Sequence, residues 1–248
     1  RKAKLRFPLA LFLPACSGVL LAEDFQTKSP EKIASVEAYG DFPREEKNLR
    51  KLDAPVIADF DQDGFADLLL NDHGFGVRIA WNNNGKFAEW FDLIMGDLHG
   101  ISVGDLDNDG NNEIVISRGG GAGENARNAK IYRVTRQREF TELRDLAKHL
   151  RRMRGRTVKL FDGDNDGDLD LLNFAFPSRE RRGTSENYIY RNDGNGNFEL
   201  AGTLPPVERD GQKTLLTDFN GDTVCDLLVY GNNRVRAFQG KGDLSFEE

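Results

Sequence analysis

A nine-residue acidic segment recurs four times along the chain, and this repeat constrains the fold more than any other feature of the sequence. The four copies begin at Asp59, Asp105, Asp162 and Asp218, so their starts are 46, 57 and 56 residues apart. Repeats of this length are typical of propeller blades and solenoids, in which each unit packs only against its neighbours. The chain is therefore expected to be an array of similar units.

Three apolar stretches accompany each acidic segment in the same order. In the second unit they cover residues 101–104, before the segment, and residues 114–116 and 130–134, after it. Short apolar stretches between turn signals are typical of β-strands, and Asn-Gly or Asp-Gly turns are typical of hairpins. Each unit then resumes at a Phe, which marks a fourth stretch. These residues are Phe87, Phe140, Phe198 and Phe246.

Each unit is therefore predicted to be four short antiparallel strands, which is one blade of a β-propeller. The predicted fold class is all-β, a β-propeller built of four-stranded antiparallel blades, four of which are visible. The blades are expected at about residues 55–97, 98–142, 156–205 and 212–248.

One helical pattern lies between the second and third units. Apolar residues there recur at the spacing of one helix face, which predicts a short helix or a long connector inserted between blades. These residues are Leu143, Leu146, Ala147, Leu150 and Met153.

The acidic segments have the composition of metal-binding loops. Carboxylates at positions 1, 3, 5 and 9 would direct oxygens at one centre, and position 7 would add a backbone carbonyl. Gly at position 6 permits a left-handed turn, and Ca²⁺ prefers such hard oxygen ligands. The predicted ligands are Asp59, Asp61, Asp63, Phe65 and Asp67; Asp105, Asp107, Asp109, Asn111 and Glu113; Asp162, Asp164, Asp166, Asp168 and Asp170; and Asp218, Asn220, Asp222, Val224 and Asp226.

Three or four Ca²⁺ ions are expected, because the fourth loop departs from the pattern. Asn220 replaces one carboxylate there, and Thr223 occupies the position of the usual Gly. The formal net charge of the chain is −7, and four bound Ca²⁺ would bring it to +1. An acidic chain without bound metal is a poor ligand for nucleic acid, so none is expected.

An EF-hand shares the Asp-x-Asp-x-Asp-Gly core of these loops but is excluded. It requires a bidentate Glu at position 12 and helices on both sides. Position 12 is occupied here by Leu70, Ile116, Asn173 and Val229, which fall within predicted strands.

The repeat, together with residues 187–198 (NYIYRNDGNGNF), resembles the FG-GAP/VCBS repeat family, which includes the propellers of integrin α-subunits. The resemblance covers roughly residues 54–248. It implies a propeller stabilised by Ca²⁺, usually of seven blades. With four units visible, the chain is interpreted as a fragment, an open array, or a small propeller completed by residues 23–54. Its end within a last strand favours a fragment.

The amino-terminal residues have the order of a secretory signal peptide. Four basic residues among the first six precede an apolar run from Phe7 to Ala22, which is followed by acidic residues. We predict a signal peptide at 1–22 and a linker or closing strand at 23–54. Processing and lipidation at Cys16 is the alternative, and a buried apolar segment is a second one. The run is too short and too broken for a transmembrane span. The protein is therefore expected to be secreted, periplasmic or at the cell surface.

Cationic residues gather in the long loops that connect second to third strands and in the connector after the second unit. In a blade these lie on the face away from the acidic loops. Loops on a rigid scaffold often carry function, so we expect a protein or an acidic glycan as partner. The residues are Arg118, Arg127, Arg144, Lys148, Arg151, Arg152, Arg154, Arg156, Arg179, Arg181 and Arg182.

These features predict an exported, calcium-binding propeller that acts as a binding or adhesion module, in which calcium is structural. The alternative is the propeller part of a secreted polysaccharide lyase or hydrolase. No catalytic residue is assigned. Gly100-Ile-Ser102-Val-Gly104 matches the nucleophile-elbow pattern, but an acidic loop follows it where that motif requires a helix.

Overall fold

The computed structural model describes residues 55–248, apart from 73–75, 89, 97, 119–125, 176–185, 205–212 and 232–233. The predicted signal peptide, Cys16 and the segment 23–54 lie outside the described residues. So do three arginines of the predicted cationic loops, Arg179, Arg181 and Arg182.

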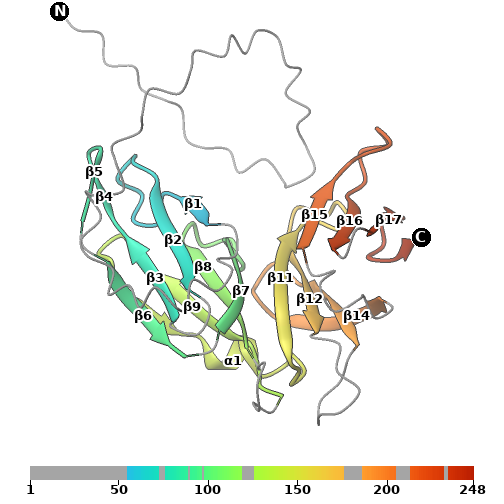
Figure 1. The fold of residues 1–248 in the computed structure, drawn as a ribbon, viewed down its shortest axis with the longest axis horizontal. Coiled ribbons are helices and arrows are strands. Elements are labelled where there is room, and N and C mark those ends of the chain that lie inside the picture. The colour runs from blue at the N-terminus through green and yellow to red at the C-terminus, as the bar shows by residue number, and fades with distance from the viewer. Residues whose placement is uncertain are drawn as a thin grey trace, which may run out of the picture.

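The described chain forms four antiparallel four-stranded sheets, which confirms the predicted propeller of four blades (Figure 1). In each sheet the strands follow one another in chain order. The first blade contains β1 (Val56–Ala58), β2 (Asp67–Asp72), β3 (Gly76–Ala80) and β6 (Phe91–Met95). The second contains β7 (Leu98–Gly104), β8 (Asn112–Arg118), β9 (Lys130–Val134) and β10 (Phe140–Glu142).

The last two blades repeat this arrangement. The third contains β11 (Gly155–Phe161), β12 (Asp170–Ala175), β13 (Asn187–Asn192) and β14 (Phe198–Leu204). The fourth contains β15 (Lys213–Thr217), β16 (Asp226–Gly231), β17 (Arg234–Gly240) and β18 (Phe246–Glu247).

The fourth strand of the first blade does not begin where the sequence predicted it. Phe87 lies instead in a small hairpin of β4 (Asn82–Asn83) and β5 (Lys86–Phe87), and the fourth strand is β6. The Asn84-Gly85 turn closes that hairpin tightly, with both residues at positive φ. In the other three blades the predicted Phe lies in the outermost strand, in β10, β14 and β18.

The predicted helix between the second and third blades is only one turn long, α1 (Arg144–Ala147). Leu150 and Met153 are nevertheless buried in the same apolar cluster as Ala147. Met153 pairs with Arg127 in an isolated antiparallel bridge, so the backbone is extended there. The apolar residues at helical spacing are therefore buried as predicted, but most of the connector that carries them is not helical.

Three apolar clusters hold the blades together, one between each pair of neighbours. The first strand of each blade contacts the first strand of the next, and β7 and β11 lie side by side in the middle of the molecule (Figure 1). At Gly100 of β7, an added Cβ would lie 2.7 Å from Thr157 Cα of β11. Only glycine permits so close an approach of the two backbones.

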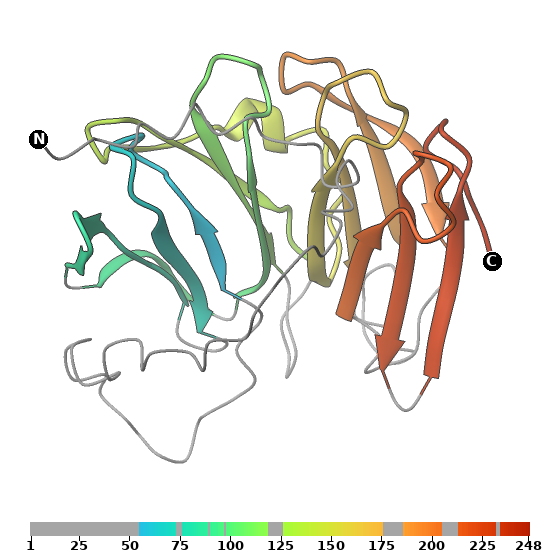
Figure 2. The same ribbon diagram turned by 90° about the horizontal axis from the view of Figure 1, so that it is seen from above.

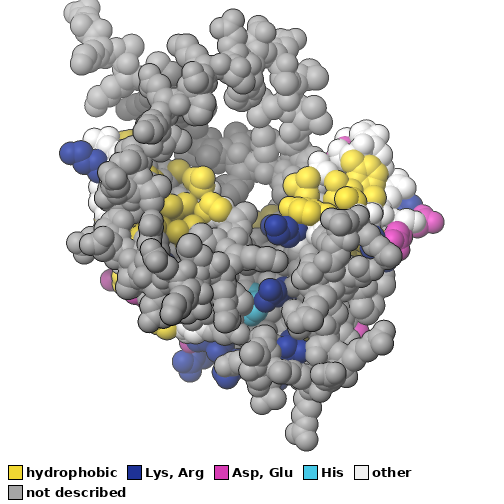
Figure 3. All heavy atoms as spheres, viewed as in Figure 1, with side chains coloured by type: hydrophobic (Ala, Val, Ile, Leu, Met, Phe, Trp, Pro, Cys, Tyr) yellow, Lys and Arg dark blue, Asp and Glu magenta, His cyan; other side chains and the backbone are white. Residues whose placement is uncertain are grey.

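The fourth blade has one apolar face packed and one exposed. Leu227, Val229 and Phe238 are buried against the third blade. On the opposite face Leu215 and Val235 are exposed, and Figure 3 shows hydrophobic side chains gathered over this blade.

The loops that join the first and second strands of the blades lie along one side of the array. In Figure 2 the β7–β8 loop and the β11–β12 loop both project at the upper edge. Neighbouring loops contact each other directly, because Gln62 Nε2 donates to the Gly110 carbonyl and Asn108 Nδ2 donates to Asp168 Oδ1 at 2.8 Å. The four predicted metal loops thus lie on the same side of consecutive blades.

Candidate metal centre

Each acidic loop is held in shape by its position-1 carboxylate. Asp59 accepts hydrogen bonds from the backbone amides of Asp63, at 3.1 Å, and Gly64, at 2.9 Å. Asp105 accepts from the corresponding amides of the second loop, and Asp162 accepts from that of Gly167 at 3.2 Å. The chain can wrap around this carboxylate because position 6 adopts left-handed φ in each loop, at +93° for Gly64 and +95° for Gly167.

The position-9 carboxylates are the most deeply buried. Asp67, Glu113, Asp170 and Asp226 are each 0% exposed. Asp170 accepts hydrogen bonds from Gly163 N at 3.0 Å and from Asn192 N at 2.9 Å, so it joins the start of the loop to β13. Asp226 links its loop to the third strand in the same way, through Gly240 N. Asp67 accepts instead from Asn82 of β4, just after the third strand, and Glu113 accepts from the Arg133 side chain of β9.

Positions 1, 3 and 9 converge in the first three loops. In each, three carboxylate oxygens lie within 4.8 Å of one another. These groups are Asp59, Asp61 and Asp67; Asp105, Asp107 and Glu113; and Asp162, Asp164 and Asp170. Oxygen donors at this spacing suit a divalent cation such as Ca²⁺.

The predicted ligands at positions 5 and 7 are arranged differently from those three. In every loop the position-5 carboxylate accepts a hydrogen bond from the amide of position 7, at 2.8–2.9 Å. These pairs are Asp63 with Phe65, Asp109 with Asn111, Asp166 with Asp168, and Asp222 with Val224. The oxygen that makes this bond closes a local turn, and the second oxygen of each carboxylate remains for other partners.

Three buried carboxylate oxygens in these groups lack a hydrogen-bond partner. They are Oδ1 of Asp107, Asp162 and Asp164. Asp162 as a whole is only 8% exposed. A buried ionised oxygen without a partner is costly, and a cation at the centre of the group would remove that cost. The residues present therefore fit a metal ion.

Burial raises the pKa of several of these carboxyls. It brings the pKa of Asp67 to about 6 and that of Asp170 to about 7, although backbone hydrogen bonds oppose the shift. Burial also raises the pKa of Asp59, Asp162 and Glu113. A bound cation would favour the ionised forms, so metal binding at these loops would release protons.

The fourth loop does not reproduce this centre. At positions 1, 3 and 9, where three carboxylates converge in the other loops, it has only two carboxylates, Asp218 and Asp226. Asn220 donates through Nδ2 to Asp222 Oδ2 at 2.9 Å, which replaces a carboxylate with an amide donor. Thr223 adopts φ of +70°, a strained conformation for a β-branched residue.

Three arginines that the sequence analysis did not assign to this site contact its carboxylates. Arg133 of β9 pairs with Asp107, Asp109 and Glu113, the last at 2.8 Å. Arg191 of β13 pairs with Asp164 at 2.8 Å. Arg138, from the turn after β9, reaches the first blade and pairs with Asp61 at 2.6 Å. A signal existed for Arg133, because strand register places it opposite Glu113.

A second cationic feature lies at the end of β8 away from its metal loop. A pocket of about 270 Å³ is lined by Arg118, Lys130, Arg144 and Lys148, with Glu142 as the one acidic residue in its lining. Glu142 accepts from Lys130 at 2.8 Å and from Arg144 at 3.2 Å, and its pKa is lowered chiefly by the Lys130 contact. Three of the predicted cationic residues, Arg118, Arg144 and Lys148, therefore meet beside α1 together with Lys130, with an excess of positive charge.

The described residues contain no helix that is long and apolar enough to span a membrane.

The chain was compared with curated proteins, with solved structures and with family models. No curated protein matches the chain. A solved lectin structure from Agrocybe aegerita, described as recognising non-reducing terminal N-acetylglucosamine, is similar with a TM-score of 0.45 and 18% identity. The match covers 78% of this chain and 50% of that one, so the chain spans about half the length of the lectin.

The family comparison bears on the first blade and the start of the second. Residues 54–116 match the FG-GAP-like repeat. They include the first two metal loops and the strands β1, β2, β3, β6 and β7. The match confirms the suspected family for this part of the chain, residues 54–116.

Proposed function

We propose that this chain is an exported, calcium-binding β-propeller that serves as a binding or adhesion module for a protein or an acidic glycan. Calcium has a structural role in this proposal. Export is supported by the signal-peptide order of residues 1–22. No residue is assigned a catalytic role.

The observation that carries the calcium proposal is the convergence of three carboxylates in the third loop, among which the buried Oδ1 of Asp164 has no hydrogen-bond partner. The equivalent residues of the first two loops supply the same donor set. Ca²⁺ bound there would neutralise the group and fix the loop to β12 and β13. We assign three ions to the first three loops and a weaker fourth to the loop that starts at Asp218.

Calorimetric titration of chelated protein with CaCl₂ tests this assignment. We expect three sites and a weaker fourth, together with proton release on binding at pH 6. Mg²⁺ should compete poorly, because it requires a more rigid octahedral site. Absence of binding heat, with no calcium retained after dialysis, would overturn the calcium proposal.

The binding role is supported by the cationic pocket beside α1. Its lining holds four cations and one carboxylate, and such an arrangement attracts sulfate or carboxylate groups. Binding of a sulfated and of a uronic polysaccharide can be measured by biolayer interferometry on the double variant Arg144→Ser/Lys148→Ser. The matched control is Lys86→Ser/Lys213→Ser, which removes two exposed cations elsewhere.

We expect the pocket variant to lose at least tenfold in affinity and the control to lose less than threefold. Equal losses would indicate an effect of net charge alone and would overturn the assigned pocket. Turnover of either polysaccharide by the wild-type protein would instead favour the alternative of a lyase or hydrolase.

A further inference from the structure

The position-3 carboxylate of each of the first three metal loops is paired with an arginine. Asp61 pairs with Arg138 at 2.6 Å, Asp164 pairs with Arg191 at 2.8 Å, and Asp107 pairs with Arg133. Each of these carboxylates belongs to a converging group that fits a metal ion. The same ligand position therefore faces a guanidinium in three different blades.

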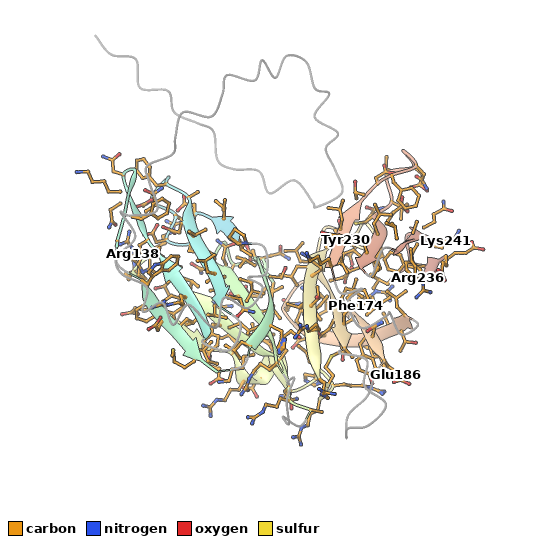
Figure 4. The ribbon with its side chains drawn as sticks, viewed as in Figure 1. Arg138, Phe174, Glu186, Tyr230, Arg236 and Lys241 are labelled. Atoms are coloured by element: carbon orange, nitrogen blue, oxygen red, sulfur yellow. The ribbon has the colours of Figure 1, made fainter. Side chains whose placement is uncertain are left out.

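The arginines do not all come from the same place in the blade. Arg133 and Arg191 lie on the third strand of their own blades. The first blade has Trp81 after its third strand, and its cation is supplied from the second blade. Arg138 lies over the Trp81 ring, with its Cζ 4.8 Å from the ring centroid, and Figure 4 shows it beside the first blade. The position-3 carboxylate is thus paired with an arginine of its own blade in the second and third loops, and with an arginine of the neighbouring blade in the first.

The fourth loop provides an internal comparison. Its position 3 is the neutral Asn220. The register of β16 and β17 pairs Leu227 with Phe238, so the next residues, Asp226 and Gln239, are opposite each other. Gln239 therefore occupies the strand position that Arg133 and Arg191 occupy in their blades. Gln239 donates to Asp222 at 3.3 Å. At positions 1, 3, 5 and 9 the first three loops each have four carboxylates and a paired guanidinium, and the fourth has three carboxylates and no paired guanidinium. The loop with one carboxylate fewer at these positions is thus the one without a paired arginine.

We propose that Arg138, Arg133 and Arg191 are built-in counter-cations of the first, second and third metal loops, which hold the loops together without metal and lower their affinity for calcium. A guanidinium beside a ligand carboxylate offsets part of the repulsion among the acidic groups. It also repels an incoming divalent cation and competes for the same oxygens. This inference rests on the proposed calcium binding and assigns a role that the repeated ligand pattern alone does not contain.

The contacts rank the three arginines. Arg133 touches three carboxylates, one of which is fully buried. Arg138 touches two, Asp61 and Asp63. Arg191 touches one and is half exposed. Screening by solvent weakens an exposed ion pair, so the effect on calcium affinity should decrease from the second loop to the first and then to the third.

Titration of each arginine-to-glutamine variant with CaCl₂, followed by NMR of backbone amides, tests the proposal. The amides of Gly64, Gly110 and Gly167 each donate to the position-1 carboxylate of their own loop, so each reports on one site. We expect Arg133→Gln to raise the affinity at Gly110 about tenfold and Arg191→Gln to raise that at Gly167 about threefold. Arg138→Gln should act at Gly64, in the neighbouring blade.

Controls separate charge from folding. Arg236→Gln removes an arginine that pairs with Glu248 in the fourth blade, away from the first three loops, and should change none of the three affinities. The substitution Gln239→Arg adds a guanidinium to the fourth loop and should lower its affinity, as reported by the amide of Thr223, which donates to Asp218. In EDTA, the three arginine-to-glutamine variants should melt below the wild type.

The outcomes distinguish this inference from the proposed function. Calcium binding by the wild type with unchanged or weaker affinity in all three variants would overturn the counter-cation role alone. No calcium binding by the wild type would overturn both proposals. Equal gains at all three glycines in every variant would show an effect of net charge and would also overturn the assignment of one arginine to each loop.

Discussion

The third and fourth metal loops have the same length and the same place in their blades, yet only the third forms a complete set of converging carboxylates. Both wrap around a position-1 Asp, and in both the position-9 Asp joins the loop to the third strand. Among their differences, Gly167 corresponds to Thr223 and Asp164 corresponds to Asn220. Positions 1 and 9 thus make the same kinds of hydrogen bonds in both blades, and we propose that positions 3 and 6 account for a difference in metal binding.

Of the tests that follow from this comparison, calcium removal should cause the largest change in stability. With free Ca²⁺ near ~1 mM and a Kd near ~0.1 mM, each site contributes about 1.4 kcal/mol. Three such sites give about 4 kcal/mol, so EDTA should lower the Tm by about 10 °C. Differential scanning calorimetry measures this, with MgCl₂ added back as the control. An unchanged Tm after chelation of calcium-loaded protein would contradict a structural role for the metal.

A matched pair of substitutions should separate the two loops next. In saturating calcium, Asp162→Asn should lower the free energy of unfolding by about 2 kcal/mol, because the ion loses a charged ligand. Asp218→Asn, the equivalent change in the fourth loop, should cost about 1 kcal/mol or less. Chemical denaturation measures both.

The sign should reverse for Asp162→Asn in EDTA. Without metal the Asp162 carboxylate is a buried charge with an unpartnered oxygen, and a neutral amide of the same shape relieves it. Destabilisation of equal size with and without calcium would mean that Asp162 acts through loop geometry and not through a metal.

The stability of the metal-free protein should also depend on pH, with a smaller change in Tm than that caused by calcium removal. The pKa values of Asp67 and Asp170 rise from 3.8 to about 6 and about 7 on folding, so the folded state binds more protons than the unfolded state. Stability is therefore greatest below about pH 4 with respect to these groups and is lost as the pH rises through 6 and 7. From pH 5 to pH 7.5 the Tm in EDTA should fall by at least about 3 °C.

Saturating calcium provides the control for that measurement, because it favours the ionised carboxylates and should remove or reverse the slope. The lowered pKa of Glu142 acts in a more acidic range and does not interfere. A Tm in EDTA that rises over this interval would contradict the assigned burial of the position-9 carboxylates.

The smallest single effect on stability is expected for Thr223→Gly, at position 6 of the fourth loop. Thr223→Gly relieves the φ of +70° and should stabilise the protein by about 0.5 kcal/mol, after the greater flexibility of glycine in the unfolded chain is included. The reciprocal Gly167→Thr should destabilise by about 1–2 kcal/mol. An added Cβ at Gly167 meets no atom within 4 Å, so that cost would be conformational. No difference between the two variants would show that position 6 tolerates left-handed backbone in any residue.

The repeat made the blades predictable, because each acidic loop and its flanking strands are local in sequence. The positions of Phe140, Phe198 and Phe246 followed from the same local order. Phe87 did not, since the tight Asn84-Gly85 turn closes a separate hairpin before the fourth strand begins. The one-turn length of α1 was also hidden, because a buried connector and a helix can share the same apolar spacing.

The arginines that pair with the carboxylates of the acidic loops were less predictable. Arg138 is 77 residues from Asp61 in sequence, and their contact depends on how the second blade packs against the first. No spacing rule connects them. Register within a blade, by contrast, connects Glu113 with Arg133, so that pairing was accessible to strand alignment. Contacts between blades, such as that of Arg138 with Asp61, could be learned only from the structure.

The side-chain amides that link neighbouring loops give the array a direction. Gln62 reaches forward to the second blade, and Asn108 reaches forward to the third. Both occupy position 4 of their loops with left-handed φ, and the fourth loop has Gly221 there, which has no side chain to extend. A copy of the first or second unit carries its own donor for this link, whereas a copy of the fourth unit does not. Internal duplication of the first or second unit would therefore bring a link of the same kind with it, and duplication of the fourth unit would not.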